Sequence, residues 1–582
     1  MLLRRLLPIL QWGPSYDRRD LRSDLAAGVT VAAMLVPQAM AYALLAGLPP
    51  EVGLYAATIP VLVYALFGTS RQLAVGPVAI VSLLTATALG QVVEEGTASY
   101  LEAAALLALL VGVVHIALGA GRLGFLVNFL SHSVLVGFTA AAAIIIGFSQ
   151  VKHLLGISIP RTDHFYETVI DVAQGLPDTH GTTIAIGLGA LVALLLLKRI
   201  MPRIPGALVV VAASIITVEL FDLKGRGVTT VGDIPDSLPS FGLPTFDGSL
   251  IGNLVPTAIV ITIVGFMESI AVAKVYARRH GYEVEPNSEL IGLGAANVAS
   301  GAFGGYPVTG GFSRTAVNDT AGSRTPLASI VTALLVLVTI AFLTPLLTSL
   351  PNAVLGAIIV VAVVGLVDVK EMRHIAHVKP TDLVSLSVAF VATLTLGIEL
   401  GIAVAVVASM LVVFARMSRP HTAVLGQVEG TTNYRNVERF PEAEVQDGVR
   451  VIRIDAAISF VNAVAVKRLV ISQSEAITDA PKALVLDASG INDLDATGAD
   501  MLTELLPELE RRGVQLHLAD VKGPVRDVLR RAGLWDSSAG RIHASTSDAV
   551  ATVTTGRPAP TDQRSWGIDE RPGTAVEETT HA

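Results

Sequence analysis

The chain has 582 residues, of which 52% are hydrophobic and 15% charged, and its mean hydropathy is +0.63. This composition is too apolar for an ordinary soluble protein of this size, so we expect most of the chain to lie in a lipid bilayer. The net charge is −8, the basic residues are scattered and cysteine is absent. These features argue against a nucleic-acid partner and exclude disulfides, thiolate catalysis and thiolate metal sites.

Residues 1–23 are predicted to form a cytoplasmic N-terminal segment. Its arginines precede the first apolar stretch: Arg4, Arg5, Arg18, Arg19 and Arg22. Because no small-residue cleavage site follows a single short apolar core, we expect the segment to be retained rather than removed as a signal peptide. Positive charge typically flanks the cytoplasmic end of a span, which predicts a cytoplasmic N-terminus.

Residues 24–416 contain apolar stretches that cross a hydrocarbon core wholly or in part, and the pattern predicts about fourteen of them. The clear full-length candidates are residues 25–48, 101–120, 125–146, 183–197, 207–220, 255–275, 328–347 and 398–414. Arg416 and Arg419 follow the last stretch, so both ends of this region are expected on the cytoplasmic side, which requires an even number of crossings. The sequence thus predicts a multi-pass protein of the cell membrane.

The first half of this region contains a helix that is expected to be interrupted at Pro37. Gln38 and Tyr42 follow one helical turn apart and therefore share a face. Further along the chain, Gly76 and Pro77 open a short apolar run, residues 75–89. Each polar side chain has an alternative role as an interhelical hydrogen-bond partner.

The second half repeats this order of features, with Glu268 and Ser269 on a helix and Gly310 and Gly311 opening another short run. Paired glycine- or proline-broken segments indicate the binding site of a transporter built from repeats. If each repeat holds seven spans, the second enters the membrane from the opposite side, because seven is odd. The predicted fold is therefore an α-helical 7+7 inverted repeat, with repeats at about residues 24–220 and 250–416.

The two broken segments predict an anion site made largely of backbone. Non-helical backbone at membrane depth survives only where it is buried in protein or lines a polar cavity. A helix that starts there directs its free N–H groups and the positive end of its dipole at that cavity. Two such half-helices, beginning after Pro77 and after Gly310, are expected to face one another.

Arg314 falls in the first turn of the second half-helix, where it adds a full positive charge. A charged side chain at the centre of a bilayer costs about 2.5–3.5 kcal/mol, so Arg314 and Glu268 each require a partner or a function. Either they pair with each other, or Arg314 attracts the anion while Glu268 binds a coupling cation. Ser313 is expected either to donate a hydroxyl to the anion or to cap its own helix.

The C-terminal part has a different texture. Residues 449–455, 483–489 and 514–520 read as strands, and residues 498–513 and 523–534 read as helices that end at glycine. These elements predict a small α/β domain at residues 448–555, after a linker at residues 417–447. The tail, residues 556–582, is rich in proline, threonine and charge, and is expected to be disordered.

Residues 36–84 resemble the signature region of the SulP family of sulfate permeases and anion transporters, which includes prestin and pendrin. Residues 423–444, which lead into residues 449–463, are similar to that family's entry into a C-terminal STAS domain. The resemblance implies a dimeric fourteen-span transporter with core and gate domains, elevator-like movement and a cytoplasmic STAS domain. The site it implies comprises Gln38, Tyr42, Pro77, Val78, Ala79, Glu268, Gly311, Phe312, Ser313 and Arg314, of which Val78, Ala79 and Phe312 rest on the resemblance alone.

In related STAS domains a residue at a helix start is phosphorylated, and Thr497 takes that position within residues 495–498. The alternative is structural, with Asp495 or Thr497 acting as the N-cap of the helix that follows.

The function most consistent with these features is secondary active transport of a small anion: sulfate, bicarbonate, chloride or a dicarboxylate. A carboxylate at the site, Glu268, favours coupling to H+ or Na+, and no other cofactor or metal is expected. Two alternatives are a nucleobase permease on the same scaffold, which Arg314 disfavours, and a membrane-tethered STAS regulator, which needs only one span. No P-loop, HExxH motif or nucleophile elbow indicates an enzyme.

Overall fold

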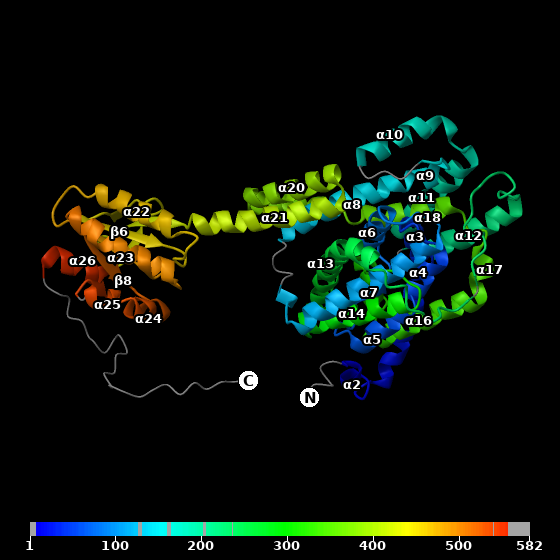
Figure 1. Ribbon diagram of the computed structural model, residues 1–582, viewed down its shortest axis with the longest axis horizontal. Helices are drawn as coiled ribbons and strands as arrows, with labels where there is room; N and C mark the ends of the chain where they lie inside the picture. The colour runs from blue at the N-terminus through cyan, green and yellow to red at the C-terminus, as the bar shows by residue number, and fades with distance from the viewer. Residues whose placement is uncertain are drawn as a thin grey trace. The chain divides into compact units, whose positions relative to one another are not determined.

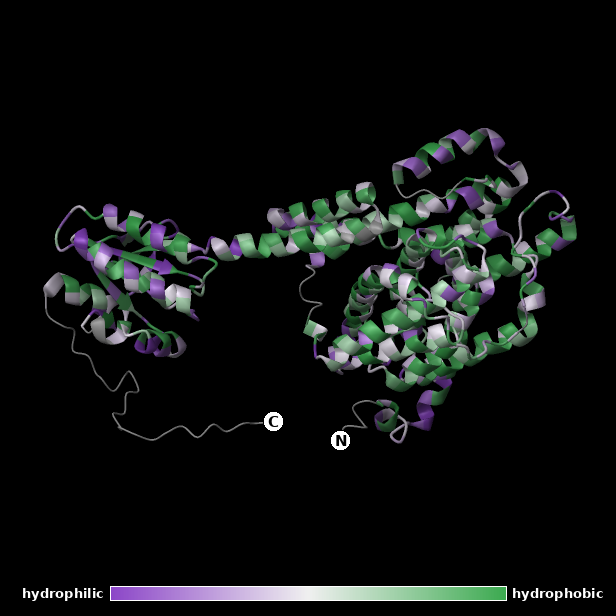
Figure 2. Ribbon diagram, viewed as in Figure 1, coloured by the Kyte–Doolittle hydropathy of each residue, from purple (hydrophilic) through white to green (hydrophobic). Residues whose placement is uncertain are grey.

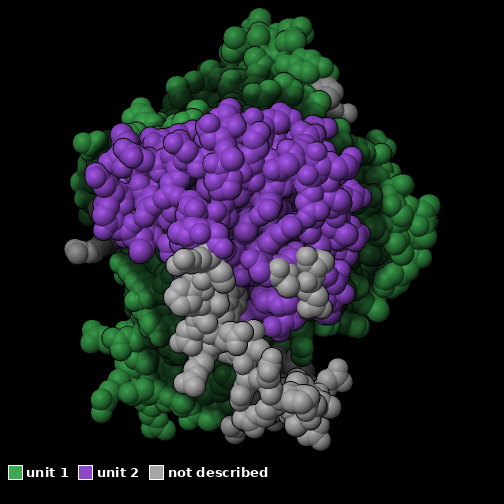
Figure 3. All heavy atoms as spheres, turned by 90° about the vertical axis from the view of Figure 1, so that its left-hand side faces the viewer, with its two compact units in different colours: residues 1–409 green, residues 410–582 purple. Residues whose placement is uncertain are grey.

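The computed structural model describes residues 7–125, 131–159, 165–201, 205–235, 237–538 and 540–556. Apart from its first residue, the tail predicted to be disordered lies outside these residues. The chain divides into two compact units, residues 1–409 and 410–582 (Figure 3). The helix α21 crosses the boundary between them.

Unit 1 is built almost entirely from helices, whose apolar residues dominate Figure 2. In chain order (Figure 1) they are α2 Ile9–Trp12, η1 Arg18–Asp20, α3 Leu21–Leu45, α4 Pro50–Ala56, α5 Ile59–Phe67, α6 Ala79–Gly90, α7 Ala98–Ala120, α8 His132–Ser149, α9 Val151–Leu155, α10 Phe165–Gly175, η3 Leu176–Asp178, α11 Gly181–Ile200, α12 Gly206–Phe221, α13 Gly248–Arg279, α14 Pro286–Ala302, α15 Phe312–Thr320, α16 Leu327–Val338, η4 Thr339–Leu343, α17 Thr344–Leu347, α18 Asn352–Val364, α19 Val369–Val378, α20 Pro380–Leu396 and α21 Ile398–Ser418. Two short strands, β1 Val75–Gly76 and β2 Thr309–Gly310, interrupt the helical pattern.

Within the described residues, eight helices or helical runs are long and apolar enough to cross a membrane. Four shorter apolar helices accompany them, and α6 is one of these. Length and composition alone do not decide how the shorter helices combine into crossings, so the count of fourteen stays a prediction.

The helix expected to be interrupted at Pro37 is in fact continuous. α3 runs through Pro37 without a break and buries the residues on both sides of it. Proline removes only one backbone hydrogen bond, and the helices packed around α3 compensate for that loss. Gln38 and Tyr42 therefore project from an intact helix rather than from a helix start.

Helices α7 and α14 pack at unusually close range. A Cβ added to Gly301 on α14 would lie 2.4 Å from the carbonyl oxygen of Ala105 on α7, and one added to Gly112 would lie 2.6 Å from the backbone nitrogen of Val298. Small residues let helix backbones approach in a membrane, where the hydrophobic effect does not drive helices together. This contact gives α14 a rigid base.

Unit 2 contains a sheet of seven strands in the order β4-β3-β6-β7-β8-β9, with β5 paired to β3. The strands are β3 Thr422–Val428, β4 Tyr434–Asn436, β5 Ala443–Glu444, β6 Val449–Ile454, β7 Ala483–Asp487, β8 Gln515–Ala519 and β9 Ile542–His543. The helices are α22 Ala463–Glu475, α23 Ala496–Arg511, α24 Gly523–Arg531, α25 Leu534–Ser537 and α26 Thr546–Thr555. Strands β6 to β9 run parallel, and of these only β7 has the near-continuous apolar sequence typical of a strand in a parallel sheet.

The segment predicted as a linker, residues 417–447, differs from that expectation. It contains β3, β4 and β5, and β3 pairs antiparallel with β6 over residues 422–425. β3 lies between β6 and the short strands β4 and β5, and it has no long apolar run, so its sequence resembles a loop.

Two histidines join the last strands of this sheet. The Nδ1 atom of His517 on β8 lies 2.9 Å from the Nε2 atom of His543 on β9, so one ring donates a hydrogen bond to the other. Burial, reinforced by His543 and Arg541, lowers the pKa of His517 to about 4. Burial also lowers the pKa of His543. Both rings are therefore neutral near pH 7, which permits the bond.

Candidate functional site

The two short strands, β1 and β2, lie side by side at the centre of the candidate site. β1 and β2 pair antiparallel, with Val75 opposite Gly310 and Gly76 opposite Thr309. The amide of Gly311 extends this pairing by donating to the carbonyl oxygen of Ala74 at 3.0 Å. Because α6 and α15 begin directly after these strands, their N-termini start from a common point.

Neither half-helix has a capping side chain at its N-terminus. The N-cap residues are Val78 for α6 and Gly311 for α15. Ser313 was one expected cap, but no capping bond from its side chain is present in the described structure, and its side chain is exposed. The first-turn N–H groups of both helices thus remain available to a ligand.

A cavity of about 640 Å³ lies beside these N-termini. All predicted site residues except Pro77 line it: Gln38, Tyr42, Val78, Ala79, Glu268, Gly311, Phe312, Ser313 and Arg314. They come from α3, α6, α13 and α15, so residues that are far apart in sequence meet at one place.

Arg314 is buried, with only 2% of its surface exposed. Its Nη1 atom donates a hydrogen bond to the carbonyl oxygen of Pro77, which links the start of one half-helix to the other. Its Nε and Nη2 atoms have no hydrogen-bond partner among the described residues. Pro77 therefore positions the cation, and two donors stay free.

The glycines at the end of β1 and directly after β2 make room for this guanidinium. A Cβ added to Gly311 would lie 3.0 Å from the Nη2 atom of Arg314, and one added to Gly76 would lie 3.5 Å from it. Gly76 also has a φ of +150°, which favours glycine. These glycines let a charged side chain lie against the backbone.

Glu268 and Arg314 line the same cavity, but no ion pair joins them in the described structure, so the first of the two alternatives, direct pairing, is absent. The Oε2 atom of Glu268 and the Oε1 atom of Gln38 are also buried without a hydrogen-bond partner among the described residues. Buried polar atoms are normally satisfied, so unsatisfied donors and acceptors around one cavity indicate a site for a ligand or for water.

Hydroxyl groups hold β2 from the side of α13. The Oγ atom of Ser269 accepts a hydrogen bond from the amide of Gly310 at 2.8 Å and lies 2.7 Å from the Oγ1 atom of Thr309. Thr309 in turn donates to the carbonyl oxygen of Gly265 at 2.7 Å. The sequence singled out Ser269 but gave it no role, and these contacts show that it supports the strand.

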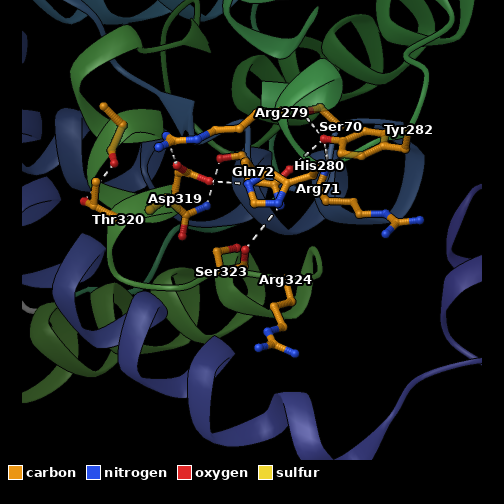
Figure 4. A network of polar contacts seen from close by, with 12 residues as sticks. Ser70, Arg71, Gln72, Arg279, His280, Tyr282, Asp319, Thr320, Ser323 and Arg324 are labelled. Carbon is orange, nitrogen blue, oxygen red and sulfur yellow. Dashed lines mark hydrogen bonds and ion pairs between the residues drawn. The ribbon is translucent and has the colours of Figure 1, made fainter. Parts of the chain in front are cut away.

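A second network ties the segment before β1 to the far end of α15 (Figure 4). The side chain of Gln72 accepts from the hydroxyl of Tyr282 at 2.7 Å and donates to the carbonyl oxygen of Ser323 at 3.2 Å. Asn318 on α15 donates to the carbonyl oxygen of Gln72 at 2.8 Å. The approach to one half-helix is thereby fastened to the other along its length.

Sequence reasoning missed several residues that line the cavity. Lys198 near the end of α11, Gly206 at the start of α12 and Ile358 on α18 also line it. These are single residues in ordinary apolar helices, with no motif that marks them. Only the folded chain shows that a second cation, Lys198, borders the cavity.

The comparisons with known proteins identify the family. A model described as the sulfate permease family matches residues 21–389, and a STAS domain model matches residues 440–549. The chain belongs to the sulfate permease family. The resemblance found in residues 36–84 and 423–444 is thereby confirmed, and a STAS domain follows the membrane part.

Other members of the sulfate permease family and of related anion transporters are similar over most of the chain. The probable sulfate transporter 4.2 of Arabidopsis thaliana is 39% identical over 548 residues, which cover 91% of this chain and 80% of that protein. The structure of murine Solute Carrier 26 family member A9, an anion transporter in the inward-facing state, is 29% identical and covers 95% of each chain with a TM-score of 0.88. The transmembrane domain of a cyanobacterium bicarbonate transporter, BicA, is 26% identical, covers 68% of this chain and 98% of its own, and gives a TM-score of 0.57. These relatives are transporters, which confirms that this family member is not an enzyme.

In the STAS domain, Thr497 is exposed in the first turn of α23. Asp495 caps that helix by accepting a hydrogen bond from the amide of Gly498 at 2.8 Å, and it also accepts from the amide of Phe460. The structural role therefore belongs to Asp495, and phosphorylation of Thr497 stays a prediction.

Proposed function

We propose that this sulfate permease family member is a secondary active transporter of small oxyanions, with sulfate as the first candidate. The observation that carries the proposal is the pair of free donors on buried Arg314, between two uncapped helix N-termini. Helix N-termini and a guanidinium are complementary to an oxyanion that accepts several hydrogen bonds. The relatives named as sulfate transporters support sulfate, and the relative named as a bicarbonate transporter makes bicarbonate the main competitor.

Glu268 supplies a reason for coupling to a cation. It borders the same cavity as Arg314, and one of its carboxylate oxygens is buried without a partner among the described residues. A carboxylate in such surroundings is stabilised by binding H+ or Na+. We therefore propose symport, in which the cation that neutralises Glu268 accompanies the anion.

The proposed transport cycle is an elevator-like movement between two groups of helices. The half-helices and α3 supply the anion-binding groups and α13 supplies Glu268, whereas α11, α12 and α18 supply other residues that line the cavity. We propose that these groups are the core and gate domains of a fourteen-span 7+7 inverted repeat at residues 24–416. In this proposal the protein is a homodimer of the cell membrane, with residues 1–23 and the STAS domain in the cytoplasm.

Two alternatives receive less support. A nucleobase is a neutral ring, so it brings no charge to balance the buried arginine, whereas an anion does. A tethered STAS regulator needs no cavity between two half-helices. Binding of uracil or xanthine to the purified chain would revive the first. Loss of all phenotype on deleting residues 440–582, while uptake continues, would revive the second.

The test is uptake into proteoliposomes that contain the full chain. Labelled sulfate, bicarbonate and fumarate are compared, each with and without an inward pH or sodium gradient. We expect saturable sulfate uptake that one of the two gradients stimulates. Absence of uptake for all three anions by correctly folded protein contradicts the proposal, and gradient-independent exchange contradicts the coupling.

A further inference from the structure

Helix α14 buries polar side chains that take no part in the cavity. Glu289 and Asn297 are fully buried and Ser300 is 1% exposed, and none of the three lines the cavity. Ionisable and polar groups inside a membrane protein are costly and are therefore retained for a function. Their partners show what that function is.

Glu289 binds the chain just before β1. Its Oε1 atom accepts hydrogen bonds from the amides of Thr69, at 2.6 Å, and Ser70, at 2.9 Å, and from the hydroxyl of Thr69. Its Oε2 atom accepts from the hydroxyl of Tyr64 at 2.7 Å. No ion pair neutralises Glu289 in the described part of the chain, so these four donors stabilise its carboxylate. The carboxylate thus fixes the backbone that leads into β1.

Asn297 binds the chain just before β2. Its side-chain amide forms two hydrogen bonds with the backbone of Val308: Nδ2 donates to the carbonyl oxygen at 2.9 Å, and Oδ1 accepts from the amide at 2.8 Å. Ser300 adds a bond from its hydroxyl to the carbonyl oxygen of Tyr306 at 2.6 Å. The side-chain amide thus satisfies both backbone groups of one residue, Val308, which fixes the position of the backbone at that residue.

Helix α14 therefore holds the segments that lead into both paired strands, β1 and β2. Glu289 and Asn297 are separated by roughly 12 Å along α14, at 1.5 Å per residue. Strand pairing as short as β1 with β2 does not specify its own register, and a slip of one residue shifts a strand by about 3.3 Å. A shift of that size would separate the free N–H groups of α6 and α15 from a common ligand.

We propose that α14 is the template that sets the register of β1 against β2, and that Glu289 and Asn297 are positioning residues for the anion site. They act through the backbone and touch no ligand. The inference rests on the proposed function, since it assigns these residues to the selectivity of the same cavity. It predicts that substitution of Glu289 or Asn297 lowers the affinity of the site for the anion and its discrimination between anions, although every cavity-lining group is still present.

The test compares Glu289→Gln and Asn297→Ala with the wild type in the full chain. In proteoliposomes, we expect the sulfate KM to rise at least about tenfold, because small displacements of binding groups have large effects. Vmax per folded protein is expected to stay within about twofold, and the preference for sulfate over bicarbonate to fall. Glu289→Asp, which keeps the charge, should give an intermediate KM. The matched control is Ser288→Ala on the same helix, which should change neither the sulfate KM nor the preference for sulfate over bicarbonate.

A purely structural role gives a different result. If folded Glu289→Gln and Asn297→Ala lose thermal stability but keep the wild-type KM and anion preference, the inference is wrong. Should Glu289→Gln fail to fold, Thr69→Val removes one donor to the same carboxylate and must change the KM in the same direction, though less. If wild-type protein takes up no anion, the proposed function fails, and amide hydrogen exchange at Gly311, whose N–H donates across the strands to the carbonyl oxygen of Ala74, then decides the inference. Faster exchange at Gly311 in Asn297→Ala supports the inference, and unchanged exchange overturns it.

Discussion

Replacing Arg314 separates an anion-binding role from a structural one. The guanidinium uses Nη1 to bind the carbonyl oxygen of Pro77 and leaves Nε and Nη2 free. A hydrogen bond to a charged group contributes about 1.5–3 kcal/mol. Since about 1.4 kcal/mol corresponds to a factor of ten in an equilibrium constant, one lost contact raises the Kd for sulfate by about 10- to 150-fold.

Lysine and glutamine divide this effect into its parts. In Arg314→Lys the charge remains, but a single ammonium cannot bind both Pro77 and an anion, so we expect the loss of about one contact. Arg314→Gln removes the charge as well, and its Kd should rise further. The control is Arg278→Gln, an exposed arginine in the last turn of α13 that does not line the cavity.

Stability supplies the second readout for Arg314. A buried cation with free donors is costly, so Arg314→Gln should not lower the Tm of the ligand-free protein, and it should abolish the Tm increase that sulfate produces. Calorimetric titration of sulfate into the purified full chain measures the Kd directly. The reasoning fails if Arg314→Gln binds sulfate within about twofold of wild type, or if it unfolds the protein.

Four further predictions address other parts of the molecule. The amide in Glu268→Gln cannot bind a proton, so sulfate uptake in the presence of a pH or sodium gradient should fall to the rate measured without a gradient. Stimulation by the gradient as large as in the wild type would rule out coupling at this residue. Gly311→Ala places a methyl group 3.0 Å from the buried guanidinium, and the sulfate KM should rise about tenfold, with an unchanged KM contradicting the close approach. Lys198→Gln should raise the sulfate KM about threefold or more and weaken its dependence on ionic strength, whereas Arg199→Gln, outside the cavity, should do neither. The pKa of His517 is lowered to about 4, below the usual value near 6.5 that the unfolded chain has. The contribution of His517 to the free energy of unfolding is therefore complete above about pH 6.5 and decreases by about 2 kcal/mol as the pH falls toward 4. Urea unfolding of residues 419–556 should show this loss of stability, and His517→Gln should largely remove the pH dependence.

The half-helices were accessible from sequence because breaks in an apolar pattern have few physical explanations. Gly76, Pro77, Gly310 and Gly311 do not continue a helix easily, and lipid does not satisfy unpaired backbone, so the breaks were expected to be buried in protein or to line a cavity. The structure places β1 and β2 at these positions. By contrast, Pro37 looked like a break and is not one, because neighbouring helices compensate for a single lost hydrogen bond.

Other parts of the site could not be found in this way. Glu289 binds Thr69, which lies 220 residues earlier in the chain, and nothing in the local pattern of either segment reports the contact. Lys198 resembles any lysine at the end of a span. Residues 422–428 form a strand because β4, β5 and β6 pair with them. The long-range partners of single residues are set by packing, whereas helix breaks and hydrophobic periodicity are local features of the sequence.

The separation of Arg314 from Glu268 has a consequence for the direction of coupling. A direct ion pair would leave the cavity neutral and its arginine unavailable, and no such pair forms in the described structure. With Glu268 ionised, the two side chains sum to zero charge, and with a cation bound to Glu268 they sum to +1. In the proposed symport, the cation therefore strengthens the attraction for an anion, and by linkage the anion strengthens binding of the cation by the same factor. In the proposed symport, each ligand therefore favours the loading of the other, in a medium where an unneutralised charge is costly.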